Sequence, residues 1–140
     1  MSVILPKLFM RYLFFILTAL IFLTISCKKY NSTSIPIGTY QGTFQRSVIN
    51  TVSNVTIKFS SKDFEGQSQY IHYPDICNGT FLISQDTISF GNACVYTADF
   101  DWSLILSGKY KVSVFGDSLI ITRAYNGIVY YDDIYKLKMQ

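Results

Sequence analysis

Side chains that could carry out nucleophilic or acid–base chemistry are few in this chain of 140 residues. Its only histidine, His72, lies in the segment Gln-Tyr-Ile-His-Tyr-Pro-Asp, and we expect it to point outward at the end of a strand. Nucleophilic catalysis requires an activated serine or cysteine beside a base. The sequence contains no nucleophile elbow, phosphate-binding loop or zinc-binding helix motif, so we predict no catalytic residues and no enzymatic activity.

Two pairs of aspartates are the other candidates for acid–base or metal chemistry: Asp99 with Asp101, and Asp132 with Asp133. Because calcium takes six or more oxygen ligands, we expect Asp99 and Asp101 to lie in a solvated connection, and a weak calcium loop is the alternative. Structural zinc needs four ligands, and the available cysteines with His72 do not supply them. We therefore predict no metal and no cofactor.

A different chemistry, acylation, is open to Cys27, which closes the first apolar run of the chain. Lys7 and Arg11 precede an apolar stretch at residues 12–25, which is shorter than the about 20 residues of a membrane-spanning helix. A basic start, an apolar stretch and a small residue before the cleavage point are the elements of a secretory signal. Residues 23–27, Leu-Thr-Ile-Ser-Cys, resemble the lipobox of a bacterial lipoprotein. The resemblance implies that Cys27 becomes the acylated first residue of the mature protein; an ordinary signal peptide or an uncleaved anchor is the alternative.

The lipobox divides the chain into an N-terminal signal helix at 1–26, the lipidated cysteine with a flexible tether at 27–37, and a folded domain at 38–140. Two acyl chains anchor a protein stably, since each buried methylene contributes about 0.8 kcal/mol. Lys28 and Lys29 add attraction for anionic head groups. We expect a lipid-anchored protein of the bacterial cell envelope, held at the outer membrane and facing the periplasm.

The folded domain differs in charge from the whole chain. The full sequence has a formal net charge of +3, whereas residues 38–140 contain eight basic and nine acidic residues, or about −1. Proteins that bind nucleic acids carry a basic patch, and the excess positive charge here belongs to the leader and tether. We therefore predict a membrane as partner, through the lipid, and no nucleic acid.

Apolar and polar residues alternate through the folded domain from Gly38 onward, and turn residues occur at intervals of about ten. This pattern is typical of an all-β barrel or sandwich. We predict eight antiparallel strands in an up-and-down barrel, because closure removes exposed sheet edges. The predicted strands are 38–47, 52–60, 66–73, 77–84, 87–94, 104–114, 117–123 and 128–138.

Cys77 and Cys94 are the two cysteines of the folded domain, and an oxidising compartment favours their pairing. A hairpin centred on residues 85–86 places Ile83 opposite Ile88 and, further out, Cys77 opposite Cys94. Counted from the turn, the cysteines occupy a non-hydrogen-bonded pair, where side chains approach most closely. We predict a disulfide worth about 3 kcal/mol; two free, buried thiols are the alternative.

The last three strands are specified by their turns. A two-residue hairpin at 116–117 places Val112 opposite Ile121 and collects the apolar side chains on one face. Between the strands predicted at 117–123 and 128–138, a plain two-residue turn at 126–127 would place apolar side chains opposite polar ones. A three-residue loop at 125–127 with a bulge instead pairs Ile121 with Tyr131, and we prefer it.

The preferred register points Asp133 inward, on the same face as Tyr131, Tyr135 and Leu137. An inward carboxylate costs free energy unless it is hydrogen-bonded. We expect Tyr131 and Tyr135 to supply hydrogen-bond donors. Two roles stay open for Asp133, a barrel-end residue in water and a contact to a ligand.

The number of strands, the opening Gly-Thr-Tyr at 38–40 and the ending Tyr-Lys-Leu-Lys at 135–138 resemble the lipocalin-like lipoproteins of Gram-negative bacteria. This resemblance covers residues 38–140 and implies an eight-stranded up-and-down barrel whose lumen can hold a small apolar ligand. Inward aromatic side chains can instead fill the interior of such a barrel. The candidate lumen-facing or ligand-contact residues are Tyr40, Tyr110, Tyr131 and Asp133.

Two functions are compatible with these features. The first is a non-catalytic binding module that holds a small hydrophobic ligand or docks an envelope partner. The alternative is a structural or interaction protein, or an inhibitor, with a solid core and no small-molecule ligand. The presence or absence of an open apolar cavity in the barrel distinguishes the two.

Overall fold

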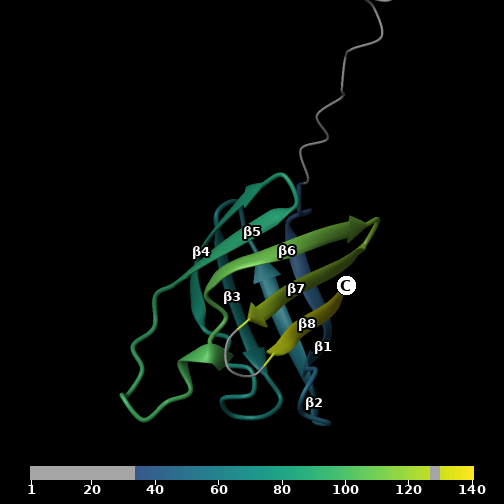
Figure 1. The fold of residues 1–140 in the computed structure, drawn as a ribbon. Coiled ribbons are helices and arrows are strands. Elements are labelled where there is room, and N and C mark those ends of the chain that lie inside the picture. The colour runs from purple at the N-terminus through teal and green to yellow at the C-terminus, as the bar shows by residue number, and fades with distance from the viewer. Residues whose placement is uncertain (1–33, 127–129) are drawn as a thin grey trace, which may run out of the picture. The chain divides into compact units, whose positions relative to one another are not determined.

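The alternating side chains produce eight strands that close into one barrel (Figure 1). The structure, a computed structural model, describes residues 34–126 and 130–140. The predicted signal helix, Cys27 and most of the predicted tether lie outside these residues. The elements are β1 (Gly38–Arg46), β2 (Val52–Phe59), β3 (Asp63–Ser68), β4 (Asn78–Ser84), β5 (Thr87–Asn92), the 3-10 helix η1 (Trp102–Leu104), β6 (Gly108–Phe115), β7 (Ser118–Asn126) and β8 (Tyr130–Met139).

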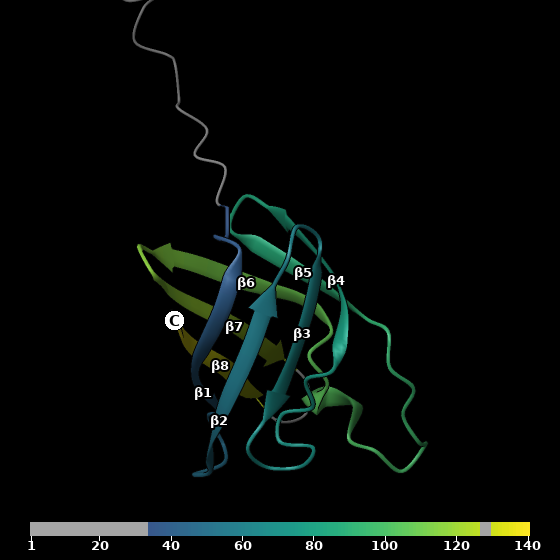
Figure 2. The ribbon, with the colours of Figure 1, turned by 180° about the vertical axis from the view of Figure 1, so that it is seen from behind.

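Each strand pairs antiparallel with the next one along the chain, and β8 pairs with β1 to close the barrel. The predicted all-β, eight-stranded, up-and-down barrel is therefore confirmed. Figure 2 shows the wall formed by β1, β2 and β3 from behind. Residues Ser32–Gln140 form a compact unit whose core comes from its own side chains, so the barrel is expected to fold without the preceding residues. No helix in the described part of the chain is long and apolar enough to span a membrane.

Two strands lie at other positions than the alternation predicts. The third strand, predicted at 66–73, is Asp63–Ser68, and residues 69–77 form a loop in which Pro74 has no N–H to donate to a ladder. His72 is exposed as predicted, but it lies in this loop rather than at a strand end. The sixth strand, predicted from residue 104, begins at Gly108 because Asp101 caps η1 and residues 102–104 become helical.

The β4–β5 and β6–β7 hairpins have the predicted registers. Ile83 pairs with Ile88, and Val112 pairs with Ile121. In both hairpins a short turn joins strands whose apolar faces match, so local information suffices to set the pairing.

The predicted disulfide between Cys77 and Cys94 is formed, with the two Cα atoms 6.4 Å apart. It joins the residue before β4 to the connection that follows β5. Because a disulfide restricts the unfolded chain, it stabilises the fold by about 3 kcal/mol for a loop of this size.

The register of β7 against β8 differs from the prediction. Ile121 pairs with Tyr135 rather than Tyr131, which shifts β8 by four residues. A shift by an even number keeps every side chain on its face, so Asp133 still points inward and is buried. The observed register places Arg123 opposite Asp133, and opposite charges on facing positions stabilise a strand pair.

Aromatic side chains fill the middle of the barrel. The rings of Phe59, Phe90, Tyr110 and Tyr135 form a continuous series, with successive centroids 6.3, 5.7 and 6.2 Å apart. Phe44 packs against the end of this series, 4.8 Å from Tyr135. The remaining buried apolar residues of the core cluster are Ile35, Tyr40, Val55, Ile57, Phe64, Ile76, Ile88, Leu106, Val112, Leu119, Ile121 and Leu137.

Candidate functional site

The long connections of the barrel lie together at one end, at the bottom of Figure 1. Alternate connections of an up-and-down barrel share an end. We call this end the loop end; it consists of residues 47–51, 69–77 and 93–107 with the adjoining ends of β7 and β8. The opposite hairpin end carries the turns at 60–62, 85–86 and 116–117 and the start of β1.

An ion cluster of Arg46, Arg123 and Asp133 lies beneath the loop end. These side chains come from β1, β7 and β8, which are neighbours in the closed sheet. Arg46 Nε and Nη2 donate to the two carboxylate oxygens of Asp133 at 2.7 and 3.0 Å, and Arg123 Nη2 donates to Oδ2 at 3.0 Å. Bidentate, charge-assisted hydrogen bonds of this kind are the strongest that side chains make.

The same two arginines hold η1 against the barrel. The carbonyl oxygen of Ser103 accepts hydrogen bonds from Nη2 of Arg46 at 2.9 Å and from Nη2 of Arg123 at 2.6 Å. Arg46 Nη1 also donates to Ser103 Oγ at 3.0 Å, and Arg123 Nη1 donates to the carbonyl oxygen of Ser107 at 3.0 Å. The cluster therefore sets the position of the connection between β5 and β6.

Aromatic rings cover both guanidinium groups. Arg46 Cζ lies 4.1 Å from the ring centroid of Tyr131, and Arg123 Cζ lies 4.5 Å from that of Tyr110. Burial lowers the pKa of Arg46, but the hydrogen bond and charge of Asp133 outweigh burial, so the pKa is raised overall. Burial raises the pKa of Tyr110. The site is thus built to hold a charged guanidinium beside a neutral phenol.

The ion cluster offers little chemistry to a substrate. Asp133 is 1 % exposed and accepts three hydrogen bonds from arginines, so its carboxylate is not free to remove a proton. Among residues 34–126 and 130–140, no three His, Cys, Asp or Glu side chains are grouped as metal ligands would be. The hydrogen bonds of Arg46 and Arg123 instead hold the connection between β5 and β6 in place.

The structure places the predicted lumen-facing residues in two different parts of the barrel. Tyr110, Tyr131 and Asp133 meet around the arginines. Tyr40 is buried toward the hairpin end, where its hydroxyl donates to a backbone carbonyl at 2.9 Å. The prediction that Tyr131 and Tyr135 donate to Asp133 is wrong; the donors are the arginines, because guanidinium groups supply several N–H donors and the compensating charge.

Sequence reasoning overlooked the two arginines as partners of Asp133. The alternation that turns Phe44 inward also turns Arg46 inward, and the same holds for Ile121 and Arg123. Three inward charges in one small domain, two positive and one negative, were the available signal, because charges are rarely buried unless they are paired.

Two loops of the loop end are clasped by Asp75. Its backbone N–H donates to the carbonyl oxygen of Leu104 at 3.0 Å, and its own carbonyl oxygen accepts from the N–H of Leu106 at 2.9 Å. Its carboxylate lies 2.6 Å from Nδ1 of His72 and accepts from the Tyr96 hydroxyl at 3.5 Å. Together with the disulfide and the ion cluster, this clasp ties the connection 93–107 to the barrel at three points.

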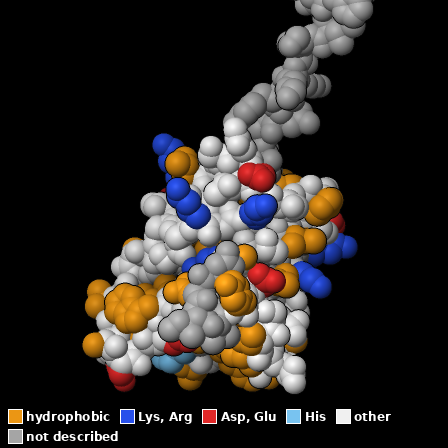
Figure 3. Space-filling view, in the orientation of Figure 1, with side chains coloured by type: hydrophobic (Ala, Val, Ile, Leu, Met, Phe, Trp, Pro, Cys, Tyr) orange, Lys and Arg blue, Asp and Glu red, His pale blue; other side chains and the backbone are white. Residues whose placement is uncertain are grey.

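Large apolar side chains project from these tied loops. Val95 is 97 % exposed, Ile71 84 % and Trp102 59 %. Figure 3 shows apolar, acidic and histidine side chains at the lower end of the barrel. We call the exposed set the apolar loop patch; its members are Val48, Ile49, Val52, Tyr70, Ile71, Val95, Trp102, Tyr125 and Tyr130.

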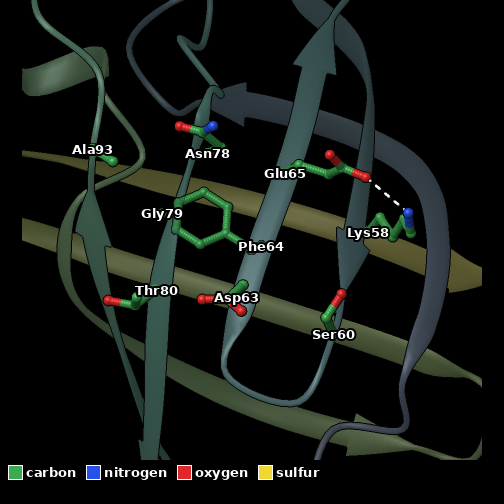
Figure 4. A pocket seen from close by; sticks show the side chains of 9 residues that line it. All are labelled: Lys58, Ser60, Asp63, Phe64, Glu65, Asn78, Gly79, Thr80 and Ala93. Carbon is green, nitrogen blue, oxygen red and sulfur yellow. Dashed lines mark hydrogen bonds and ion pairs between the residues drawn. The ribbon is translucent and has the colours of Figure 1, made fainter.

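Two hollows of the described residues open through the barrel wall to solvent, and the second reaches Tyr110 and the ion-cluster residue Arg123. One of about 510 Å³ opens beside β2, β3 and β4 and is lined mainly by polar side chains, among them the Lys58–Glu65 ion pair at 2.9 Å (Figure 4). A second, of about 590 Å³, lies along β6, β7 and β8. Both are open to solvent, unlike the enclosed apolar pocket that a small hydrophobic ligand occupies.

Comparison with family models, curated proteins and solved structures finds no match for this chain. The class of the protein therefore rests on its fold, a closed, eight-stranded, antiparallel up-and-down barrel. That fold is compatible with a lipocalin-like barrel.

Proposed function

We propose that this protein is a lipid-anchored, non-catalytic binding module of the bacterial cell envelope that contacts a partner protein through its loop end. The observation that carries the proposal is the contrast between a filled interior and a set of exposed aromatic and aliphatic side chains on loops that are held in place. A small hydrophobic ligand in the lumen is the weaker choice, because the aromatic series occupies that space.

The apolar loop patch has the composition of a contact surface. Trp and Tyr dominate the binding energy of protein interfaces, and Trp102, Tyr70 and Tyr130 are all exposed here. Loops that are already ordered lose less entropy on binding. The ion cluster, the disulfide and the Asp75 clasp supply that order.

The proposed anchor is connected to the barrel at the end opposite to the apolar loop patch. Ser34 is seven positions after Cys27, so this part of the tether spans at most about 25 Å when extended. The barrel begins at the hairpin end, where Gly38 pairs with Phe59 beside the 60–62 turn. A lipid at Cys27 would therefore join the barrel through its hairpin end, which leaves the loop end free of the chain connection to the anchor.

Site-specific photo-crosslinking in intact cells tests the proposal. A photo-reactive amino acid at Val95 is expected to give a discrete crosslinked product, and the same group at Leu82, which is 70 % exposed on the outer face of β4, is the matched control. Equal crosslinking from both positions, or none from Val95, contradicts a loop-end partner. A Cys27→Ser variant is expected to leave the membrane fraction and to lose labelling by a fatty-acid analogue.

Thermal-shift measurements with fatty acids address the small-ligand alternative. We expect no stabilisation of the barrel, residues 32–140, because a bound chain would have to displace packed aromatic rings. A concentration-dependent rise in melting temperature would support a lumen ligand, since ligand binding to the folded state stabilises it.

A further inference from the structure

The exposed carboxylates of the loop end outnumber its accessible basic groups, and the described loops contain neither lysine nor arginine. Asp99, Asp101 and Asp132 are exposed there. The two arginines beneath the loops are engaged with Asp133 and with backbone carbonyls. Arg46 Nη1 also lies 3.8 Å from Oδ2 of Asp101, whose side chain stays 58 % exposed. Two lysines, Lys109 and Lys111, line the same outer-wall hollow as Asp132. The other lysines of the folded domain lie elsewhere on the outer wall or toward the hairpin end: Lys58, Lys62, Lys136 and Lys138.

An exposed aromatic residue follows one of these carboxylates in the chain. Asp101 precedes Trp102, whose ring packs against Tyr96 with centroids 6.0 Å apart. An ammonium or guanidinium group gains both from a carboxylate and from the face of an aromatic ring, so such a pair favours a cationic group over an anionic one.

We propose that the partner segment that docks on the apolar loop patch carries lysine or arginine side chains among apolar ones. This inference rests on the proposed loop-end function and names the chemistry of the partner. An anionic lipid surface is a poor occupant, because it would meet the acidic side chains of the loop end. Contact between the loop ends of two copies is disfavoured for the same reason, since like charges would face each other.

Trp102 supplies a local readout, because it is the only tryptophan of the chain and belongs to the patch. The barrel, residues 32–140, is titrated with a short synthetic peptide of lysine and leucine that lacks aromatic residues, while Trp102 emission is recorded. The matched peptide has glutamate in place of lysine. We expect saturable binding of the lysine peptide, weakening as salt is raised, and no saturable change with the glutamate peptide or with anionic vesicles.

Charge-neutralising variants test the named carboxylates. The double variant Asp101→Asn and Asp132→Asn is expected to bind the lysine peptide about fivefold more weakly, from two exposed ion pairs of ordinary strength. Asparagine at position 101 can still cap η1, so the loop should keep its conformation. Asp117→Asn at the hairpin end removes the same kind of charge and is expected to leave the affinity unchanged.

The inference is overturned if the lysine peptide does not bind, if the glutamate peptide binds as tightly, or if the double variant binds like Asp117→Asn. These outcomes are separate from failure of the proposed function, which is read from crosslinking at Val95 in cells. If Val95 crosslinks to a partner but the Asp101 and Asp132 substitutions do not change peptide binding, the loop end still binds a partner, and only the inference that the partner is cationic is wrong.

Discussion

Replacing Asp133 by asparagine removes the carboxylate that lies between the guanidinium groups of Arg46 and Arg123. The side chains of Arg46 and Asp133 are 5 and 2 % exposed, and that of Arg123 is 19 % exposed. Three charge-assisted hydrogen bonds end on the carboxylate. An asparagine amide keeps one acceptor oxygen but turns an NH2 group toward a guanidinium donor, so at least one of these bonds is lost. Arg123 then loses its counter-charge, and Arg46 keeps only the longer ion pair with Asp101, at 3.8 Å.

Removing one partner of a buried ion pair costs about 3–5 kcal/mol, and the partial exposure of Arg123 favours the lower part of that range. Since small domains unfold with about 5–15 kcal/mol, Asp133→Asn should remove a large share of the stability. Urea unfolding followed by circular dichroism and by Trp102 emission measures the loss. Trp102 lies in η1, which Arg46 and Arg123 hold in place. In the Asp133→Asn variant, Trp102 emission should therefore change at urea concentrations below those of global unfolding.

Two further variants decide whether the reasoning is right. Glu65→Gln breaks the exposed ion pair with Lys58 and removes the same formal charge, and it should leave the free energy of unfolding almost unchanged. Replacing Arg46, Arg123 and Asp133 together by apolar residues should recover much of the stability, because no charge is then left unpaired. The reasoning is refuted if Asp133→Asn costs no more than Glu65→Gln.

Three other predictions follow from the barrel itself. Cys77→Ser with Cys94→Ser should lower the free energy of unfolding by about 3 kcal/mol, and a reductant should destabilise the wild type but not the double variant. Burial raises the pKa of Tyr110 and Tyr135 above the usual 10.0, so the stability that these neutral phenols contribute is complete below about pH 10 and is lost as pH rises above 10. Urea unfolding at a series of alkaline pH values, with tyrosinate absorbance, measures this loss. A free energy of unfolding that does not change with pH in that range would contradict the prediction. A Cβ at Gly42 would overlap the facing β8 backbone, so Gly42→Ala should cost at least about 1–3 kcal/mol; an unchanged melting temperature would show that the β1–β8 seam can move.

Much of the barrel follows from local sequence. Alternation with period two determines which face each side chain takes, and that is why Asp133, Tyr135 and Leu137 all point inward as predicted. Short turns bring their two strands together without help from the rest of the chain. The β4–β5 and β6–β7 registers and the disulfide could therefore be predicted.

The candidate site depends on contacts between distant segments. Arg46 and Asp133 are 87 positions apart, and they meet only because β8 closes the barrel against β1. No local pattern reports that closure. The loop between β5 and β6 is similar, since η1 takes its position from arginines on β1 and β7.

By itself, the sequence determined the all-β class and the face of the side chains in the strands, and its resemblance to a lipobox predicts an anchor at Cys27. Only the tertiary structure decided the register of β8, the partners of Asp133 and the gathering of exposed aromatic side chains at one end. The physical reason is that period-two alternation is unchanged by a shift of two or four residues. Registers that differ by two or four residues keep the same side chains inward, so only contacts between distant segments make one register more stable than another. For β8 these contacts are the pairing of Arg123 with Asp133 and of Ile121 with Tyr135.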